Sequence, residues 1–372
     1  MFAVIMTGGS GTRFWPVSRK RKPKQFINIT GGAPMVVETC DRLGPVARDD
    51  EMILVLGKDH LDDAMDLFAG RKLHMLAEPV GRNTAPCIGL GAIYARHLGY
   101  DGPVAFLPAD HYIGDPPAFL GALSAAGKLA ESGGIATLGI VPNRPETGYG
   151  YIRRDQSHID INGLTAFRVS EFVEKPDLKI ALNYLKTGEY YWNAGIFVAT
   201  AETIMREIHT LLPGLHEGLL RLENVLGTDQ FEGELDKIYA GLESVSFDYG
   251  IMEKTKEEVY VVPCECGWSD VGSWASLYDL KSTNYDKDQN LAEGETFLID
   301  CEESFISARG GRLVTCLGLI SARGGRLVTC LGLKKCLVID TPDTLLVADL
   351  HRSQDVRKIV NKLQETGKGE LL

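Results

Sequence analysis

Short apolar runs alternate with longer amphipathic stretches through the first half of the chain. The stretch 85–97 places Ala85, Ile88, Ala92 and Ala95 on one helical face, and the stretch 118–130 follows a similar pattern. Strand-like runs lie between such stretches, at residues 2–6, 52–56, 73–76, 104–107 and 135–140. This alternation predicts an α/β fold with a doubly wound, mainly parallel sheet.

Polar residues follow the ends of several predicted strands. Glu78 comes after the run 73–76, and Asp110 and His111 come after the run 104–107. The carboxyl ends of parallel strands meet at one edge of a sheet, so we expect these side chains to line one crevice.

The pattern changes after about residue 284 to short β-rich runs with Gly and Asp turns, and an amphipathic helix is predicted at 353–363. We therefore predict a first domain over residues 1–285 and a smaller β-rich domain over residues 286–372.

The second domain contains a perfect duplication. The sequence ISARGGRLVTCLGL occupies residues 306–319 and again residues 320–333. Structural repeats diverge wherever packing permits, so this identity indicates a recent duplication or an error of sequence assembly. The surplus copy is expected to form an extra hairpin, an alternative register or a loop.

Composition is typical of a soluble two-domain enzyme. The 372 residues are 44% hydrophobic and 24% charged, and the apolar runs fall short of the ~20 residues of a membrane span. The chain also starts directly in a strand pattern, so we expect a cytoplasmic protein. A net charge of −11 argues against a nucleic-acid partner, so placed cations or a metal ion must meet any anionic substrate.

Eight cysteines raise the alternatives of disulfides and zinc. Cys264 and Cys266 form a CxC pair, and the sequence offers neither a second pair nor a His pair at zinc spacing. We expect free, buried thiols.

A glycine loop directly follows the first strand-like run. Small residues at Gly8, Gly9, Ser10 and Gly11 let the backbone approach a phosphate and turn N–H groups toward it. Thr12 follows, and Arg13 and Lys24 add cationic side chains, so the segment is interpreted as a cradle for a triphosphate.

Two other phosphate loops fit less well. A Walker loop requires Gly-Lys followed by Ser or Thr, whereas Thr12 and Arg13 follow Gly11. A dinucleotide fingerprint requires a third glycine where Phe14 stands, and residues 27–30 offer no acid for a ribose.

The segments Thr12-Arg13-Phe14-Trp15-Pro16 and Pro23-Lys24-Gln25-Phe26 resemble the signature of the sugar nucleotidyltransferases, specifically the mannose-1-phosphate guanylyltransferase branch. The resemblance implies a Rossmann-like nucleotidyltransferase fold with a C-terminal domain similar to a left-handed β-helix. It also implies that Arg13 and Lys24 steady the nucleotide phosphates and the transition state.

Two aspartates are candidate metal ligands. Asp110 follows a predicted strand, and Asp270 lies in the segment Trp268-Ser269-Asp270-Val271-Gly272. Each alone is compatible with a cap or turn, but two carboxylates facing a triphosphate suit Mg²⁺. The resemblance implies that both bind the metal.

Four residues are candidates for binding the sugar phosphate. Glu174 can accept hydroxyl hydrogen bonds, Asn193 can donate and accept, Gly148 exposes its N–H, and Lys175 can reach a sugar phosphate. Each alone is compatible with an ordinary turn or edge strand, but their order resembles the family's sugar-binding motifs.

Base recognition is less specific. Glu78 can accept the N–H donors of guanine, and the resemblance favours that role. Asn83 and Thr84 are nucleotide-binding candidates that also precede a predicted helix, so helix capping competes. A later segment, 246–254, also resembles the family, with Asp248 as a supporting group and no role assigned.

The resemblance implies that the protein transfers GMP from GTP to α-D-mannose 1-phosphate, giving GDP-mannose and pyrophosphate with Mg²⁺. Alternatives are another hexose-1-phosphate nucleotidyltransferase that forms ADP- or UDP-sugars, and a noncatalytic nucleotide-sugar sensor on the same fold. A glycosyltransferase is disfavoured because the sequence lacks an evident Asp-x-Asp motif. The sequence does not fix the oligomeric state, and a homodimer is one candidate.

Overall fold

The structure, a computed structural model, describes residues 1–9, 11–294, 296–309, 314–316, 328–329 and 332–372. The chain forms two compact units. The first contains Met1–Gly8 and Val36–Trp268, and the second contains Gly9–Met35 and Ser269–Leu372. The backbone therefore passes between the units at three places, one of them inside the glycine loop.

A nine-stranded sheet forms the centre of the first unit, in the order β3-β2-β1-β4-β8-β5-β9-β7-β6. Each of the five predicted strands is present, with ends within two residues of the prediction. They are β1 (Phe2–Met6), β2 (Met52–Gly57), β3 (His74–Glu78), β4 (Pro103–Pro108) and β5 (Ile135–Ile140). All five residues of β1 are buried, as expected for a parallel strand covered on both faces.

The sheet has a topological switch point at β1. The chain proceeds from β1 to β2 and β3 on one side, and then β4 pairs with β1 on the other side, all in parallel. The Ala109 N–H donates to the Met6 carbonyl oxygen at 3.0 Å, which holds the ends of β1 and β4 together. In open α/β sheets, this is the position where ligands bind.

The other half of the sheet contains antiparallel strands. β8 (Tyr190–Thr200) pairs antiparallel with β4 and β5, and β9 (Val259–Pro263) runs parallel to β5. β6 (Gly150–Ile161) and β7 (Leu164–Glu174) form a hairpin. The sheet is therefore mixed, with the predicted parallel part around β1.

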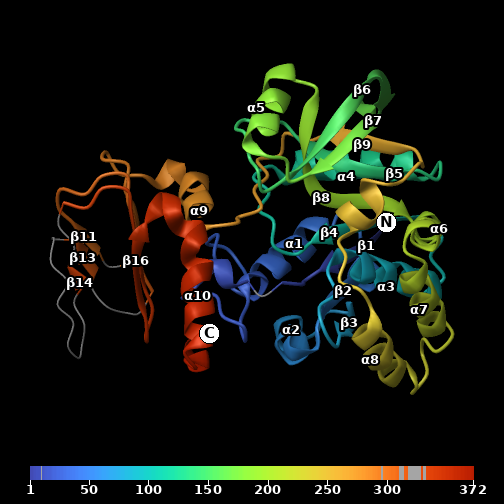
Figure 1. The fold of residues 1–372 in the computed structure, drawn as a ribbon, viewed down its shortest axis with the longest axis horizontal. Coiled ribbons are helices and arrows are strands. Elements are labelled where there is room, and N and C mark those ends of the chain that lie inside the picture. Colours follow the sequence, from blue (N-terminus) through green and yellow to red (C-terminus); the bar gives the residue numbers. More distant parts are fainter. Residues whose placement is uncertain (10, 295, 310–313, 317–327, 330–331) are drawn as a thin grey trace. The chain divides into compact units, whose positions relative to one another are not determined.

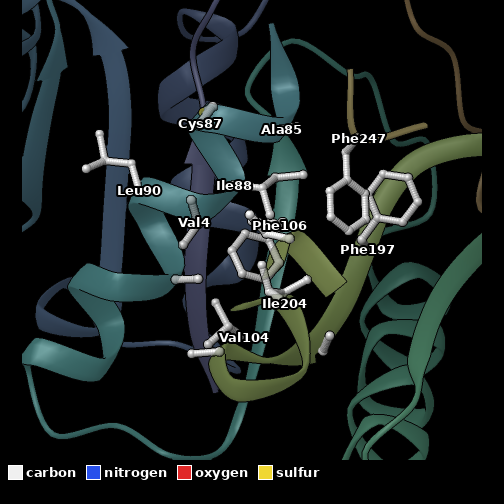
Figure 2. Close-up of a cluster of buried hydrophobic side chains, with 14 of the residues drawn as sticks. Val4, Ala85, Cys87, Ile88, Leu90, Val104, Phe106, Phe197, Ile204 and Phe247 are labelled. Atoms are coloured by element: carbon white, nitrogen blue, oxygen red, sulfur yellow. The ribbon is translucent and has the colours of Figure 1, made fainter. Parts of the chain in front are cut away.

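Helices cover the sheet and close its core. Apolar residues of α3 (Thr84–His97), including Ile88, pack with Val4 and Phe106 of the central strands, and Phe247 joins the same cluster (Figure 2). Asn83 and Asp115 cap α3 and α4 (Pro116–Ala130). The remaining helices are α1 (Met35–Leu43), α2 (Leu61–Leu67), α5 (Leu178–Thr187), α6 (Ala201–Leu211), α7 (Pro213–Glu223) and α8 (Phe231–Gly241). Among the described residues, no helix combines the length and apolar character needed to cross a membrane.

Two small sheets make up much of the second unit. One has the order β10-β12-β15-β16 and the other the order β11-β13-β14. Strands β10 to β13 alternate between the two sheets, β14 then lies beside β13, and β15 returns to the first sheet. The pairings up to β15 are parallel, as in a β-helix. The strands are β10 (Leu291–Glu293), β11 (Thr296–Leu298), β12 (Phe305–Ala308), β13 (Val314–Cys316), β14 (Val328–Thr329), β15 (Cys336–Asp340) and β16 (Leu345–Asp349).

The duplicated segment is described only in part. Val314 pairs with Val328 and Thr315 with Thr329, so equivalent residues of the two copies are parallel neighbours in one sheet. Most of the remaining residues of the two copies lie outside the described part, and the predicted hairpin, alternative register or loop falls largely on them.

An aromatic cluster ties the signature segment to the β-rich region within the second unit. The Phe14 and Trp274 rings lie 5.0 Å apart, and Trp274 and Phe305 lie 5.7 Å apart. The Trp15 indole N–H donates to the Leu371 carbonyl oxygen at 2.8 Å. Trp274 begins α9 (Trp274–Leu280), and α10 (Val356–Glu365) packs against the helical turn Thr12–Phe14 (Figure 1). The predicted boundary at 285/286 stays a prediction.

Candidate active site

The glycine loop begins where β1 ends. The Thr7 N–H and hydroxyl both donate to the Val55 carbonyl oxygen at 2.8 Å, which fixes the chain just before Gly8. Gly9 and Gly11 have φ angles of +104° and +59°, values that favour glycine. Ser10 lies outside the described residues. The backbone thus leaves the switch point in a conformation suited to presenting N–H groups to an anion.

Gly11 brings the two halves of the signature together. A Cβ at Gly11 would overlap the Lys24 backbone nitrogen and lie 2.9 Å from the Pro23 Cβ. The Gln25 side-chain amide lies 3.5 Å from the Gly9 carbonyl oxygen, a long hydrogen bond. The Gly-rich and Pro-Lys-Gln segments therefore pack directly on each other in the second unit.

Lys24 is held in a defined position. It is only 5% exposed, its Nζ donates to the Asp270 carbonyl oxygen at 2.7 Å, and it lies 5.9 Å from the Phe14 ring centroid. Two of the predicted site residues, Lys24 and Asp270, are thereby brought together.

Arg13 lies in the same unit, on the turn that also contains Thr12. Its Nη1 is 3.1 Å from the position that a Cβ of Gly272 would take, and the Asp270 Oδ2 is 2.5 Å from that same position. Within the described part of the chain, Arg13 has no hydrogen bond and no ion pair. Its guanidinium is thus available to an anion.

A second guanidinium approaches Arg13 from α10. Burial, and after it the positive charge of Arg13, lowers the pKa of Arg357. Like charges repel, so two neighbouring guanidiniums favour an anion between them.

Asp110 lies at the switch point of the first unit, two residues after β4. The preceding Ala109 is buried, and its carbonyl oxygen accepts a hydrogen bond from the Thr39 hydroxyl at 3.1 Å. Asp110 itself is partly exposed. Asp270 belongs to the second unit.

Aromatic side chains connect the Asp110 region to the predicted sugar segment. The Trp268 indole N–H donates to the His111 Nδ1 at 3.1 Å, so His111 has a hydrogen-bonding role within the unit. The Tyr149 ring lies 5.4 Å from Trp268 and 5.3 Å from Trp192. These contacts place Gly148, next to Tyr149, in the same region of the first unit.

Gly148 and Glu174 are both restrained by neighbours. The Gly148 N–H donates to Glu146 Oε1 at 3.1 Å. Glu174 ends β7 with a side chain only 8% exposed, and it accepts a hydrogen bond from Lys175 Nζ. Its Oε2 is buried without a partner among the described residues, 2.5 Å from the position of a Cβ at Gly150. Lys175 has a φ of +51°, a left-handed conformation often found at functional sites.

Asn193 lies on β8 in a hydrogen-bond network. Its Oδ1 accepts from the Gly195 N–H at 3.0 Å and from the Thr137 hydroxyl at 3.4 Å. Its Nδ2 donates to Asp248 Oδ1 at 2.8 Å. The amide is therefore oriented by three partners.

The three predicted base-recognition residues have internal roles. Asn83 Oδ1 accepts from the Thr84 N–H at 2.9 Å, and the Thr84 hydroxyl accepts from the Phe247 N–H at 2.8 Å. Glu78 is 5% exposed, and burial raises its pKa to about 7, against a smaller lowering from the Tyr239 hydroxyl. Its Oε1 has no partner within the part of the chain that the structure describes. Capping is thus the observed role of Asn83, and nucleotide contacts stay a prediction for all three.

Sequence reasoning assigned no role to Asp248, Glu146 or Arg357. The sequence did point to Asp248, because the segment 246–254 resembles the family although no role could be assigned to it. No sequence motif pointed to Glu146 or Arg357, because their contacts with Gly148 and Arg13 depend on how the chain folds.

Family models match both parts of the chain. The model described as "Nucleotidyl transferase" matches residues 2–287, and one described as "MannoseP isomerase/GMP-like beta-helix domain" matches residues 294–363. The mannose-1-phosphate guanylyltransferase of Escherichia coli (strain K12) is 36% identical over 375 residues, covering 100% of this chain and 75% of that protein. The chain belongs to the mannose-1-phosphate guanylyltransferase branch of the sugar nucleotidyltransferases.

Other relatives agree with this membership. The xanthan biosynthesis protein XanB of Xanthomonas campestris pv. campestris (strain B100) is 37% identical to this guanylyltransferase-family chain, covering 99% of it and 74% of XanB. A solved structure named as a mannose-1-phosphate geranyltransferase from Thermus thermophilus superposes with a TM-score of 0.84. It is 34% identical and covers 98% of this chain and 99% of that one. The expected nucleotidyltransferase fold with a β-helix domain is confirmed.

Proposed function

We propose that this enzyme transfers GMP from GTP to α-D-mannose 1-phosphate, forming GDP-mannose and pyrophosphate. A phosphate oxygen of the sugar ester forms a bond to the α-phosphorus of GTP, and the bond between that phosphorus and the bridging oxygen to the β-phosphate breaks. The nucleophile is already charged, so in-line placement and charge neutralisation suffice without a general base. Family membership and the packing of Lys24 against the glycine loop support the proposal.

The nucleotide phosphates are assigned to the signature. The N–H groups of Gly8, Gly9, Ser10, Gly11 and Thr12 are proposed to donate to phosphate oxygens, and Arg13 and Lys24 to neutralise charge that develops on the leaving pyrophosphate. Lys24 is suited to this because its ammonium group is already positioned before substrate binds.

Members of the family generally depend on a divalent metal ion, and we propose Mg²⁺ held by Asp110 and Asp270. Mg²⁺ typically takes one or two carboxylates and completes its shell with phosphate oxygens and waters, so two carboxylates are a fitting donor set. Among the described residues there is no cluster of three or more His, Cys, Asp or Glu side chains of the kind that holds zinc. When bound, the ion would supply charge stabilisation on the triphosphate. Both carboxylates are assigned on the strength of the resemblance.

The sugar phosphate is assigned to the first unit. Lys175 is proposed to contact its phosphate. Glu174, Gly148 and Asn193 are proposed to contact its ring, Asn193 through the N–H of Nδ2 that Asp248 does not use. The Glu174 Oε2, which has no partner among the described residues, supports this, because a buried carboxylate oxygen normally has a donor. Glu78, Asn83 and Thr84 are proposed to lie at the guanine.

The decisive experiment is a substrate matrix that follows pyrophosphate release. GTP, ATP and UTP are each combined with mannose 1-phosphate or glucose 1-phosphate, with and without Mg²⁺. We expect the fastest release with GTP, mannose 1-phosphate and Mg²⁺. A preference for ATP or UTP would favour an ADP- or UDP-sugar enzyme, and no release with any pair would favour a noncatalytic sensor.

A cytoplasmic location, a homodimeric state and the absence of nucleic-acid and membrane partners stay predictions. Size-exclusion chromatography with light scattering measures the second of these directly.

A further inference from the structure

We propose that Asp248 directly binds a hydroxyl of the hexose, and that Asn193 is the residue that positions it. This inference rests on the proposed function and extends it to a residue on the turn Asp248–Met252, for which the sequence offered no role.

Asn193 has little hydrogen-bonding capacity left for a ligand. A side-chain amide offers two donor and two acceptor positions. The Asn193 Oδ1 accepts from the Gly195 N–H, and the Thr137 hydroxyl lies 3.4 Å from the same oxygen while donating to the Ile196 carbonyl oxygen at 2.9 Å. One N–H of Nδ2 is used by Asp248. A sugar that approached Asn193 would find a single free N–H donor. The carboxylate of Asp248, which is hydrogen-bonded to Asn193, can instead accept a hydrogen bond from a sugar hydroxyl.

The backbone of Asp248 is held in position from two sides. The preceding Phe247 is fully buried, and its ring lies 5.0 Å from Phe197 of β8 (Figure 2). The Phe247 N–H donates to the Thr84 hydroxyl at 2.8 Å, so the N-terminus of α3 anchors the same turn. The turn is π-helical, a rare geometry that is frequent at functional sites.

The groups around the Asp248 carboxylate also suit a sugar phosphate. The Asp248 Oδ1 accepts a hydrogen bond from Asn193, and the carboxylate also interacts with its own backbone N–H. No other residue in the described part of the chain donates to its Oδ2. Burial, and after it the Glu174 carboxylate, raises the pKa of Asp248 to about 6. Lys175, whose Nζ lies 5.9 Å from the Tyr249 ring centroid, contributes a positive charge. Two carboxylates beside one ammonium group match a ligand that carries hydroxyls and a phosphate ester.

The experiment combines an enzyme variant with substrates that lack single hydroxyls. Wild type and Asp248→Asn are compared with mannose 1-phosphate and its 2-, 3- and 4-deoxy analogues. If Asp248 binds a hydroxyl, Asp248→Asn raises the KM for mannose 1-phosphate about ten- to a hundredfold and leaves the KM for GTP nearly unchanged. One deoxy analogue should then be poor for wild type but cause little further loss in the variant.

Controls separate direct binding from a structural role. Asp236→Asn, an exposed change on α8, should leave both KM values unchanged. Asn193→Ala should raise the sugar KM less than Asp248→Asn does, and should weaken the response to the same deoxy analogue. If Asp248→Asn proves unfolded by circular dichroism, Asp248→Ser replaces it in the same series.

The outcomes are distinguishable. The role of Asp248 would be overturned if Asp248→Asn raised the KM values for GTP and mannose 1-phosphate equally. It would also be overturned if, for every deoxy analogue, the effects of the variant and of the missing hydroxyl were additive in free energy. If wild type itself shows no activity with GTP and mannose 1-phosphate, the proposed function fails instead.

Discussion

At the scale of single residues, the site depends on a glycine that close packing requires and on ionisable side chains that are buried. Gly11 is required by contact, because a Cβ there would overlap the Lys24 backbone. Lys24, Glu78 and Asp248 are ionisable side chains in largely or partly buried surroundings. The residue types were evident from the sequence, whereas the overlap and the burial were not.

Replacing Gly11 with Ala is expected to displace Lys24 and reduce kcat strongly, because the new methyl group overlaps a backbone atom. Gly188→Ala is the matched control. Gly188 has a similar φ of +66°, and nothing lies within 4 Å of its Cβ position. The control should lose only about 1 kcal/mol of unfolding free energy through backbone strain, with kcat retained. Equal behaviour of the two variants in thermal unfolding and turnover would contradict the overlap argument.

Lys24→Ala is expected to reduce kcat by about 100- to 1,000-fold, because it removes a preorganised donor from the developing charge. Lys20→Ala changes an exposed lysine nearby and should have normal turnover. The measurement is pyrophosphate release at saturating substrates, with circular dichroism to confirm folding. A near-normal rate for folded Lys24→Ala would remove this residue from the mechanism.

Glu78→Gln should make stability less dependent on pH. The pKa of Glu78 is raised from 4.5 to about 7, so the folded chain holds a proton that the unfolded chain releases. This stabilisation is fully present below about pH 4.5 and is lost as the pH rises through about 7. The variant should therefore gain up to about 3 kcal/mol over wild type at high pH and less at acidic pH.

Thermal unfolding at about pH 8 and pH 5.5 measures this difference. Glu232→Gln, an exposed change, serves as the control and should give the same Tm difference at both values. A Glu78→Gln gain that does not grow with pH would indicate that Glu78 is ionised without penalty.

At the scale of elements, α10 is more than a peripheral helix. It packs against Thr12–Phe14 and brings Arg357 near Arg13. The helix was predicted approximately, at 353–363, and its role could not be, because the neighbour of Arg357 is set by packing between segments far apart in the chain.

Arg357→Ala is expected to raise the KM for GTP roughly tenfold, because one of two neighbouring cations near the phosphate loop is lost. Lys358→Ala is the control, since Lys358 pairs with Asp355 on the helix surface at 2.8 Å. Steady-state kinetics with varied GTP measures both. A KM that responds equally to the two substitutions would indicate only a general effect of charge.

The five strands around β1 were predicted because each is a continuous apolar run that parallel pairing buries on both faces. The antiparallel part was not evident, since half of β6 is exposed and the burial of its partner β7 alternates irregularly. The glycine loop and Asp110 were located for the same reason as the strands, because each follows the end of such a run.

At the scale of the whole molecule, the two units do not correspond to two consecutive stretches of chain. Residues 9–35 belong with the C-terminal residues. Phe14 packs against Trp274, and the Trp15 indole N–H donates to the Leu371 carbonyl oxygen. The signature was recognised from adjacent residues, while its support comes from residues more than 250 positions later.

A fragment that ends at residue 285 is therefore expected to lose most activity, because Phe305 and Leu371 no longer support the signature. A milder change, removal of Leu371 and Leu372, should lower unfolding free energy by about 1 kcal/mol through loss of the Trp15 hydrogen bond. Thermal unfolding and pyrophosphate release measure both. A fully active fragment would instead favour an independent domain over residues 1–285.

The aromatic support of the signature also has a consequence for biosynthesis. On the ribosome, Phe14 and Trp15 leave the exit tunnel long before Trp274 and Phe305 have been translated. Until those partners arrive, two large aromatic side chains of the nascent polypeptide lack their final burial and are candidates for chaperone capture. The first catalytic segment to be synthesised is thus among the last to mature.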